Sequence, residues 1–283
     1  MENIIHFFAN IPSSTRSIIL VTGLTLFFLL EAGFPLFRFK YEKARHTLLN
    51  LFFTLTTLLI NLSGAFLILW AADYNLQYQS GILPIIQSNI PSIPYWILVL
   101  IGVLLLDFIG AWFIHWLEHR IKWMWKFHII HHTDPCVDVT TGLRHHPGES
   151  ILRFGFTLVA VFVSGSSIGI VMLYQTLSAF FAQLTHANIR TPKKLDAIFS
   201  IILVTPTFHK IHHHFILPDT DKNYGNIFSI WDRLFNTSIN VGKMKNIKYG
   251  LDTHQLKKEQ SSLKDLLLIP FKPYRFPVGS KFS

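Results

Sequence analysis

Long apolar stretches separated by short polar segments dominate the first part of the chain. Residues 17–37, 47–72 and 94–116 are almost uninterrupted runs of apolar side chains. A helix needs about 20 such residues to cross a hydrocarbon core of about 30 Å. The segment between the second and third runs carries Pro84 and Pro91, which interrupt helices. The pattern therefore predicts three transmembrane helices.

A fourth apolar run, residues 151–184, is too long for one membrane-spanning helix. As a single helix its 34 residues would be about 51 Å long at 1.5 Å per residue. The sequence SGSS at 164–167, in its middle, is typical of a turn. We therefore predict a helical hairpin that enters and leaves on the same face, which puts His146 and His186 on one side of the membrane. Each arm is short for a full span, so a partly re-entrant hairpin is an open alternative.

The composition agrees with a membrane protein. Half of the 283 residues are apolar and only 14% are charged, whereas soluble domains have about 25% charged residues. We predict an N-terminal membrane region with two spans and an extracytoplasmic loop at 1–93, a histidine-rich region at 94–240, and a basic cytoplasmic tail at 241–283. The predicted fold is all-α: a polytopic membrane protein with about three transmembrane helices plus a helical hairpin, capped by a cytoplasmic histidine-rich helical metal domain.

The distribution of lysine and arginine predicts the orientation of the chain. The net charge of +9 is compatible with nucleic-acid binding, but the apolar runs favour the positive-inside bias of a membrane protein. Basic residues are absent between positions 46 and 119 and frequent afterwards. The 38–45 loop and everything after His119 are therefore predicted to be cytoplasmic, and we expect no nucleic-acid partner. Lys243, Lys245 and Lys248 are interpreted as a solvated face near anionic headgroups; docking of an electron donor there is the alternative.

Histidines occur in groups with the spacing of one helical face. Side chains at i, i+3 and i+4 lie together on a helix, and three groups follow this spacing, with His146 and His186 between them. The groups are His115 and His119; His128, His131 and His132; and His209, His212 and His213. So many imidazoles exceed the needs of one ion, which predicts a catalytic dinuclear centre. Imidazole binds zinc, copper, iron and nickel, so ligand type leaves the metal open. The single cysteine excludes a thiolate cluster.

The order of these groups resembles the fatty acid hydroxylase / sterol desaturase superfamily of membrane oxygenases. The resemblance covers residues 95–240 and includes the patterns HxxxH, HxxHH, R-x-HP-x-E, H-x-N and TP-x-FH-x-x-HH, followed by NYG and WDRLFNT. It implies that 94–240 is a catalytic domain with two iron ions, zinc being an alternative metal in the isolated protein. It also implies that O2 is the co-substrate and that a fatty acyl or sterol-like C–H bond is hydroxylated or desaturated. The implied ligands are His115, His119, His128, His131, His132, His146, His186, His209, His212 and His213. His145 and His214 stand where the family does not ask for histidine.

Several carboxylates are candidates for orienting these ligands, because a ligating histidine normally donates its other N–H to an acceptor. The candidates are Glu118, Asp134, Asp138, Glu149, Asp219, Asp221 and Asp232. We assign catalytic roles to two carboxylates. Glu149 follows His146 by three residues and could share its face. Asp107 lies eight residues, about 12 Å of helix, inward of His115, and an intramembrane carboxylate points to function. We predict that it orients a ligand or gates a lipid channel.

The predicted protein is therefore an integral membrane oxidoreductase of the bacterial inner membrane or the endoplasmic reticulum. Its metal site would be cytoplasmic, and its lipid substrate would enter from the bilayer. Electrons would come from a separate donor of the cytochrome b5-like or ferredoxin type, because no flavin, haem or NAD(P) motif is present. Two alternatives stay open: a non-redox zinc-binding membrane protein, and a zinc-dependent hydrolase of a lipid amide or ester.

Overall fold

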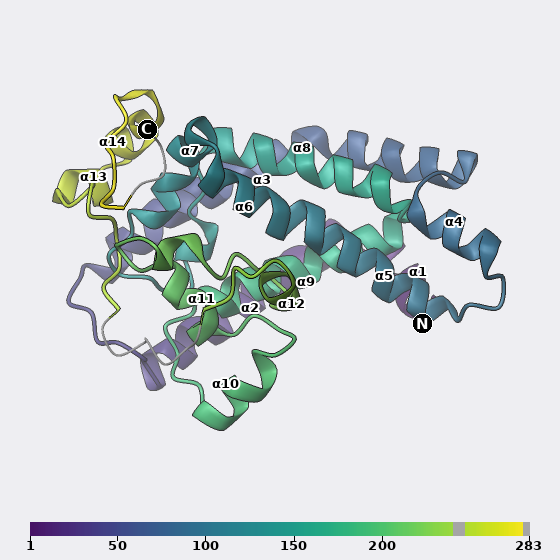
Figure 1. Cartoon of the computed structure of the whole chain (residues 1–283), viewed down its shortest axis with the longest axis horizontal. Helices are drawn as coiled ribbons and strands as arrows, with labels where there is room; N and C mark the ends of the chain where they lie inside the picture. The colour runs from purple at the N-terminus through teal and green to yellow at the C-terminus, as the bar shows by residue number, and fades with distance from the viewer. Residues whose placement is uncertain (240–246, 280–283) are drawn as a thin grey trace.

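The computed structural model describes residues 1–239 and 247–279, and its elements over these residues are all helical (Figure 1). Lys243 and Lys245 lie outside the described residues. Five helical stretches are long and apolar enough to cross a membrane. They are α2 (Ser13–Gly33), α3 (Lys43–Tyr78) together with α4 (Ile82–Asn89), α5 (Tyr95–Asp107) continued by the π-helix η1 (Phe108–Phe113) and α6 (Ile114–Arg120), α8 (Pro147–Ser164) and α9 (Ile168–His186). This confirms the predicted all-α fold with several apolar helices long enough to span a membrane.

The surface of α3 has the character of a lipid-facing helix. Leu58, Leu62 and Phe66 expose between 50% and 64% of their surface, which a helix in water would not do along its length. The packed side of the spans forms one apolar core in which Ala71 of α3, Leu106 of α5, Val161 of α8 and Val171 of α9 are fully buried. The bundle is therefore organised around the hairpin.

The tip of the hairpin lies at the end of the bundle that carries α1 (Glu2–Ala9) and α4 (Figure 1). Gly165 ends α8 with a left-handed φ of 71°, a conformation that favours glycine. Its Cα is closely approached by Gly81, just before α4, so neither position has room for a β-carbon. Ile5 of α1 packs against Gly169 at the start of α9. The two arms thus reach the end opposite α7, which favours a full crossing over a re-entrant hairpin.

Shorter elements lie at the opposite end of the bundle and beside its middle (Figure 1). They are α7 (Lys122–His132), η2 (Thr141–Leu143), α10 (Lys193–Phe199), α11 (Pro206–His212), η3 (Asp219–Asp221), α12 (Ile230–Leu234), α13 (Lys257–Ser261), α14 (Leu263–Leu268) and η5 (Ile269–Phe271). The C-terminal segment is docked there, since Leu266 is fully buried in a cluster with Trp125, Ile130 and Phe53. The segment formed by α14 and η5 therefore packs against α7 and α3.

Glu31, near the end of α2, fixes this helix to the histidine-bearing end. Its carboxylate is buried and accepts hydrogen bonds from the backbone N–H groups of Val139 at 2.6 Å and Asn188 at 2.7 Å. Lys43 supplies an opposite charge at 3.5 Å. A buried carboxylate is stable only with such partners, so α2 holds two loops that flank the histidines.

Candidate metal centre

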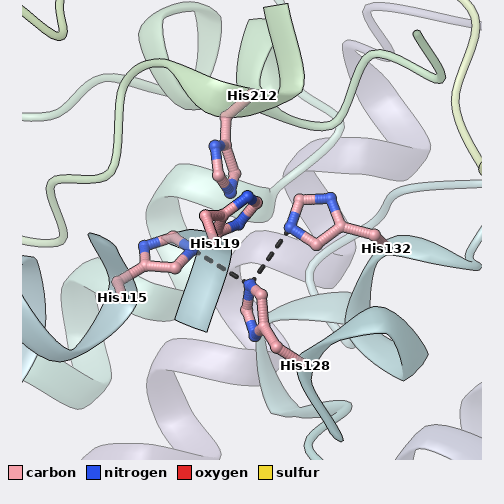
Figure 2. Close-up of side chains that lie close together, drawn as sticks. All are labelled: His115, His119, His128, His132 and His212. Carbon is pink, nitrogen blue, oxygen red and sulfur yellow. Dashed lines mark hydrogen bonds between the residues drawn. The ribbon is translucent and has the colours of Figure 1, made fainter. Parts of the chain in front are cut away.

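The first group of histidines comes from α6, α7 and α11. The chain is extended at Ile121, and this break turns the histidine face of α7 toward that of α6. His128 then lies between His115 and His132, with Nε2–Nε2 distances of 3.1 Å to each. Figure 2 shows the rings of this first cluster pointing toward one another. It comprises His115, His119, His128, His132 and His212, whose ligand atoms all lie within 4.8 Å of one another.

A second cluster lies directly beside the first. It comprises His131, His186, His209 and His213, again with ligand atoms within 4.8 Å of one another. Nε2 of His186, at the end of α9, is 3.1 Å from that of His131 and 3.0 Å from that of His209. The clusters are contiguous, because the rings of His132 and His213 are 4.8 Å apart between centroids. Nine of the ten predicted ligands are thus brought together in two adjacent groups.

Acceptors outside the clusters determine which ring nitrogen faces inward. A carbonyl oxygen can only accept, so an Nδ1 bonded to one must carry the hydrogen, and Nε2 then holds a lone pair. Three histidines donate in this way at 2.7 Å: His115 to the carbonyl of Tyr224, His186 to that of Ala182, and His212 to that of Lys222. His128 donates to Glu149 at 2.7 Å. These histidines therefore aim unprotonated Nε2 atoms into the clusters.

This donor set fits metal ions. The Nε2 atoms of His115 and His128 lie 3.1 Å apart with no hydrogen available between them, and two lone pairs at this distance repel unless a cation binds both. Two imidazole nitrogens bound at about 2.1 Å and at right angles to one ion would lie about 3 Å apart. Burial lowers the pKa of His128 to about 3, against the effect of Glu149. Burial and Lys210 lower that of His209 to about 3. Both rings are therefore neutral, as ligands must be.

His146 lies apart from the other nine predicted ligands. It precedes Pro147 and caps α8, and its Nδ1 accepts a hydrogen bond from the backbone N–H of Gly148 at 3.0 Å. Its Nε2 is 3.3 Å from the carbonyl of Leu267, and its ring packs against Phe127. The capping geometry turns the imidazole toward the C-terminal segment. The structure therefore does not support His146 as a ligand.

The neighbouring residue, His145, lies beside the clusters instead. Its ring stacks on His131 with centroids 4.9 Å apart and planes 13° from parallel. Its Nδ1 donates to Glu149 at 2.7 Å. His145 was not predicted as a ligand, because the family pattern does not require a histidine there. Pro147 could have indicated this difference in the sequence. A proline at the start of a helix favours a capping position for the residue before it, which here is His146.

Glu149 and Glu118 form a buried charged group behind the first cluster. One oxygen of Glu149 accepts hydrogen bonds from His128, His145 and Arg153. Glu118 pairs with Arg153 and lies 3.5 Å from Nδ1 of His128. Glu149 thus accepts a hydrogen bond from His128. The sequence had suggested His146, three residues before it, as its neighbour on one helix face. Its geometry makes it a positioning residue for a ligand.

Two aspartates in the chain after α11 support the histidines, Asp221 by direct contact and Asp232 through the backbone. Asp232 accepts from the backbone N–H groups of Tyr224 and Gly225, both at 2.9 Å, and from the Trp112 indole at 3.0 Å. It thereby fixes the turn whose Tyr224 carbonyl accepts from His115. Asp221 lies 3.3 Å from Nδ1 of His119. The candidates Asp134 and Asp138 instead pair with His46.

Asp107 is fully buried at the junction of α5 and η1. It accepts hydrogen bonds from the backbone N–H groups of Ile227 and Phe228, at 3.3 Å each, and from the Trp231 indole at 3.0 Å. These contacts tie the membrane helix to the segment that follows Tyr224. A role in orienting a ligand or gating a channel stays a prediction, and any effect on the histidines would pass through this segment.

Replacing Asp107 by asparagine is expected to destabilise the protein and to leave its metal content unchanged. The amide has one acceptor oxygen for three donors, and a buried donor left unpaired costs about 1–3 kcal/mol. Thermal unfolding in detergent and metal analysis would measure both quantities. Asp73→Asn, at an exposed position of α3, is the matched control. Unchanged stability, or loss of metal without loss of stability, would contradict the structural role of Asp107 in tying α5 to the segment after Tyr224.

The part of the chain that carries the histidine clusters is similar to known proteins. The family model described as fatty acid hydroxylase matches residues 99–237. An ornithine lipid hydroxylase of Rhizobium tropici is 29% identical over 54% of this chain and 45% of its own length. Alkylglycerol monooxygenases of Homo sapiens and Xenopus tropicalis are 29% and 30% identical, each over 57% of this chain and about a third of their own length. The chain thus spans less than half the length of these relatives. No solved structure matches it significantly.

Proposed function

Because residues 99–237 belong to the fatty acid hydroxylase family, we propose that this membrane protein uses O2 and two iron ions to oxidise a C–H bond of a lipid. The observation that carries the proposal is the pair of adjacent buried histidine clusters with inward-facing Nε2 atoms. A closed structural zinc site needs only four ligands. Nine convergent imidazoles in two groups support a dinuclear centre with room for chemistry.

The first cluster would hold one ion and the second cluster the other. Iron bound there would supply the redox chemistry that activates O2, which amino-acid side chains cannot provide. The protein orients the imidazoles through the carbonyls of Tyr224, Ala182 and Lys222 and through Glu149. It also excludes water, since all nine histidines are buried. These are the contributions that a protein makes to such chemistry.

The position of the centre supports a substrate that stays in the bilayer. His115 lies at the end of an apolar helical stretch that begins at Tyr95, so the clusters lie next to the hydrocarbon region. The named relatives act on an ornithine lipid and on alkylglycerols, which supports a lipid substrate here. The distribution of basic residues supports a centre on the cytoplasmic side. A separate cytochrome b5-like or ferredoxin-type protein would deliver the electrons.

Product analysis with isotopically labelled O2 tests the proposed reaction. Purified protein would be supplied with membrane lipids and a chemical or protein reductant. Label in a new lipid hydroxyl is the expected result for a hydroxylase, and a new double bond for a desaturase. Tightly held zinc, with neither product formed, would contradict the proposal and indicate a non-redox zinc protein. Release of a fatty acid without label would indicate the zinc-dependent hydrolase instead.

A further inference from the structure

A cavity of about 380 Å³ opens beside the start of α3, outside the histidine clusters. Its walls come from the 40–42 loop, the first turns of α3, the 135–136 loop and α13. Such a volume lies in the range of small-molecule sites, about 300–1,000 Å³, and exceeds what a bare inorganic ion needs. The 40–42 loop continues directly into α3, but this stretch, the 135–136 loop and α13 are far apart in sequence, so the cavity is a product of the fold.

The charged side chains that line this cavity are mostly cationic. Lys40, Arg45 and Lys257 each come from a different wall, and Glu42 is their single acidic neighbour among the lining residues. Glu42 and Arg45 are both exposed, and their charged atoms are 3.9 Å apart. An exposed pair of this kind contributes only about 0–1 kcal/mol, so Arg45 can turn to another anion. An anion in the cavity would therefore be close to three basic side chains, and Glu42 would compete with it only weakly.

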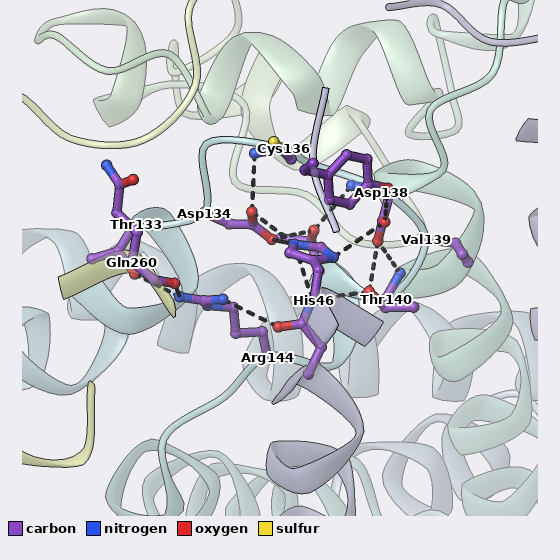
Figure 3. A network of polar contacts seen from close by, with 12 residues as sticks. His46, Thr133, Asp134, Cys136, Asp138, Val139, Thr140, Arg144 and Gln260 are labelled. Carbon is purple, nitrogen blue, oxygen red and sulfur yellow. Dashed lines mark hydrogen bonds and ion pairs between the residues drawn. The ribbon is translucent and has the colours of Figure 1, made fainter. Parts of the chain in front are cut away.

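Two aspartates lie behind one wall of the cavity, where His46 pairs with both of them. Asp134 and Asp138 are almost fully buried behind His46, whose ring nitrogens lie 2.9 and 3.3 Å from their respective carboxylates (Figure 3). Tyr41 donates to Asp138 at 2.7 Å, and Thr141 donates to Asp134 at 2.7 Å. His46 and Tyr41 thus form a wall between these carboxylates and the cavity. An anion in the cavity meets the basic side chains instead.

We propose that this cavity binds the phosphate of an organic phosphate, such as the headgroup of an anionic phospholipid. The site lies where α3 leaves its basic flanking loop, and juxtamembrane basic residues attract anionic lipids with about 1 kcal/mol each. Arg45 provides a planar guanidinium that suits phosphate oxygens, and the two lysines add point charges. The site is separate from the histidine clusters, so it does not depend on the proposed reaction.

The only cysteine of the chain lines the cavity and reports on its occupation. Burial raises the pKa of the Cys136 thiol to about 12, with Asp134 and Asp138 acting in the same direction. Alkylation is therefore slow, and is best followed by intact mass at about pH 9. The metal-loaded protein in neutral detergent would be tested with dioctanoylphosphatidylglycerol, dioctanoylphosphatidylcholine, glycerol 3-phosphate and inorganic phosphate. At about ten times its Kd, a ligand should slow alkylation about tenfold.

Protection by phosphatidylglycerol, but not by phosphatidylcholine, is the expected result for a lipid headgroup. Equal protection by glycerol 3-phosphate would also support a phosphate site, with a soluble ligand as its source. The double variant Arg45→Gln/Lys257→Gln should lose protection, and Lys258→Gln/Lys264→Gln, at exposed lysines outside the cavity, should keep it. The proposal would be overturned by protection that survives Arg45→Gln/Lys257→Gln, by equal protection with phosphatidylcholine, or by no protection of the wild-type protein.

Discussion

Replacing His128 by alanine is expected to remove one metal ion and to abolish turnover. Nε2 of His128 lies 3.1 Å from Nε2 of both His115 and His132, so this ring is central to the first cluster. Removing an outer partner of a metal ligand already costs about 10–100-fold in affinity or activity, so losing the ligand itself should cost at least about 100-fold. Metal analysis and product formation from the same preparation would measure both effects.

His146→Ala is the matched control for this substitution. The two histidines were predicted as equivalent ligands, but His146 caps α8 at a distance from the clusters. The variant should keep its full metal content and lose only the stability that a helix cap contributes, about 0.5–2 kcal/mol. Equal loss of metal in the two variants would contradict the assignment of His128 to the cluster and of His146 to the cap.

Glu149→Gln is expected to lower metal affinity and turnover by about 10–100-fold, the range measured for outer partners of metal ligands. The carboxylate accepts the Nδ1 hydrogen of His128 at 2.7 Å and thereby keeps the lone pair of this ring on Nε2. Glutamine preserves the size of the side chain but removes its charge and can present an N–H to the ring. Metal titration and turnover at saturating metal would separate the loss of affinity from the loss of catalysis.

Glu118→Gln controls for the removal of a buried charge. Glu118 is as buried as Glu149 and also pairs with Arg153, but it lies 3.5 Å from the ring nitrogen of His128, beyond a good hydrogen bond. A smaller loss of metal affinity is therefore expected. If both variants lost affinity equally, the charge of the group and not the hydrogen bond to His128 would control the ligand.

The sequence predicted the spans and most of the cluster because both depend on local periodicity. Apolar runs of sufficient length form helices in a membrane regardless of their neighbours. Spacings such as that of His128, His131 and His132 place side chains on one helical turn, where α7 has them. The same turn nevertheless divides its histidines between the two clusters, with His131 in the second. That division depends on how α9 and α11 pack, which no local pattern contains.

The remaining differences concern single side chains whose partners are distant in sequence. His145 and His146 are adjacent, and only the capping role imposed by Pro147 decides which one faces the clusters. Glu31 accepts hydrogen bonds from the backbone N–H groups of Val139 and Asn188, which are both more than a hundred residues away in sequence. The hydrogen bond from His115 to Tyr224 uses a backbone carbonyl. Every residue has a backbone carbonyl, so the amino acid at this position does not indicate that its carbonyl accepts a hydrogen bond. The sequence alone therefore could not predict this contact.

We propose above all that the two histidine clusters bind two metal ions for redox chemistry. The most direct test of this proposal is the metal stoichiometry of protein purified anaerobically from iron-replete cells, measured by element-resolved mass spectrometry against quantitative amino-acid analysis. We expect two iron ions per chain. One ion per chain, or zinc in place of iron under these conditions, would contradict the proposal.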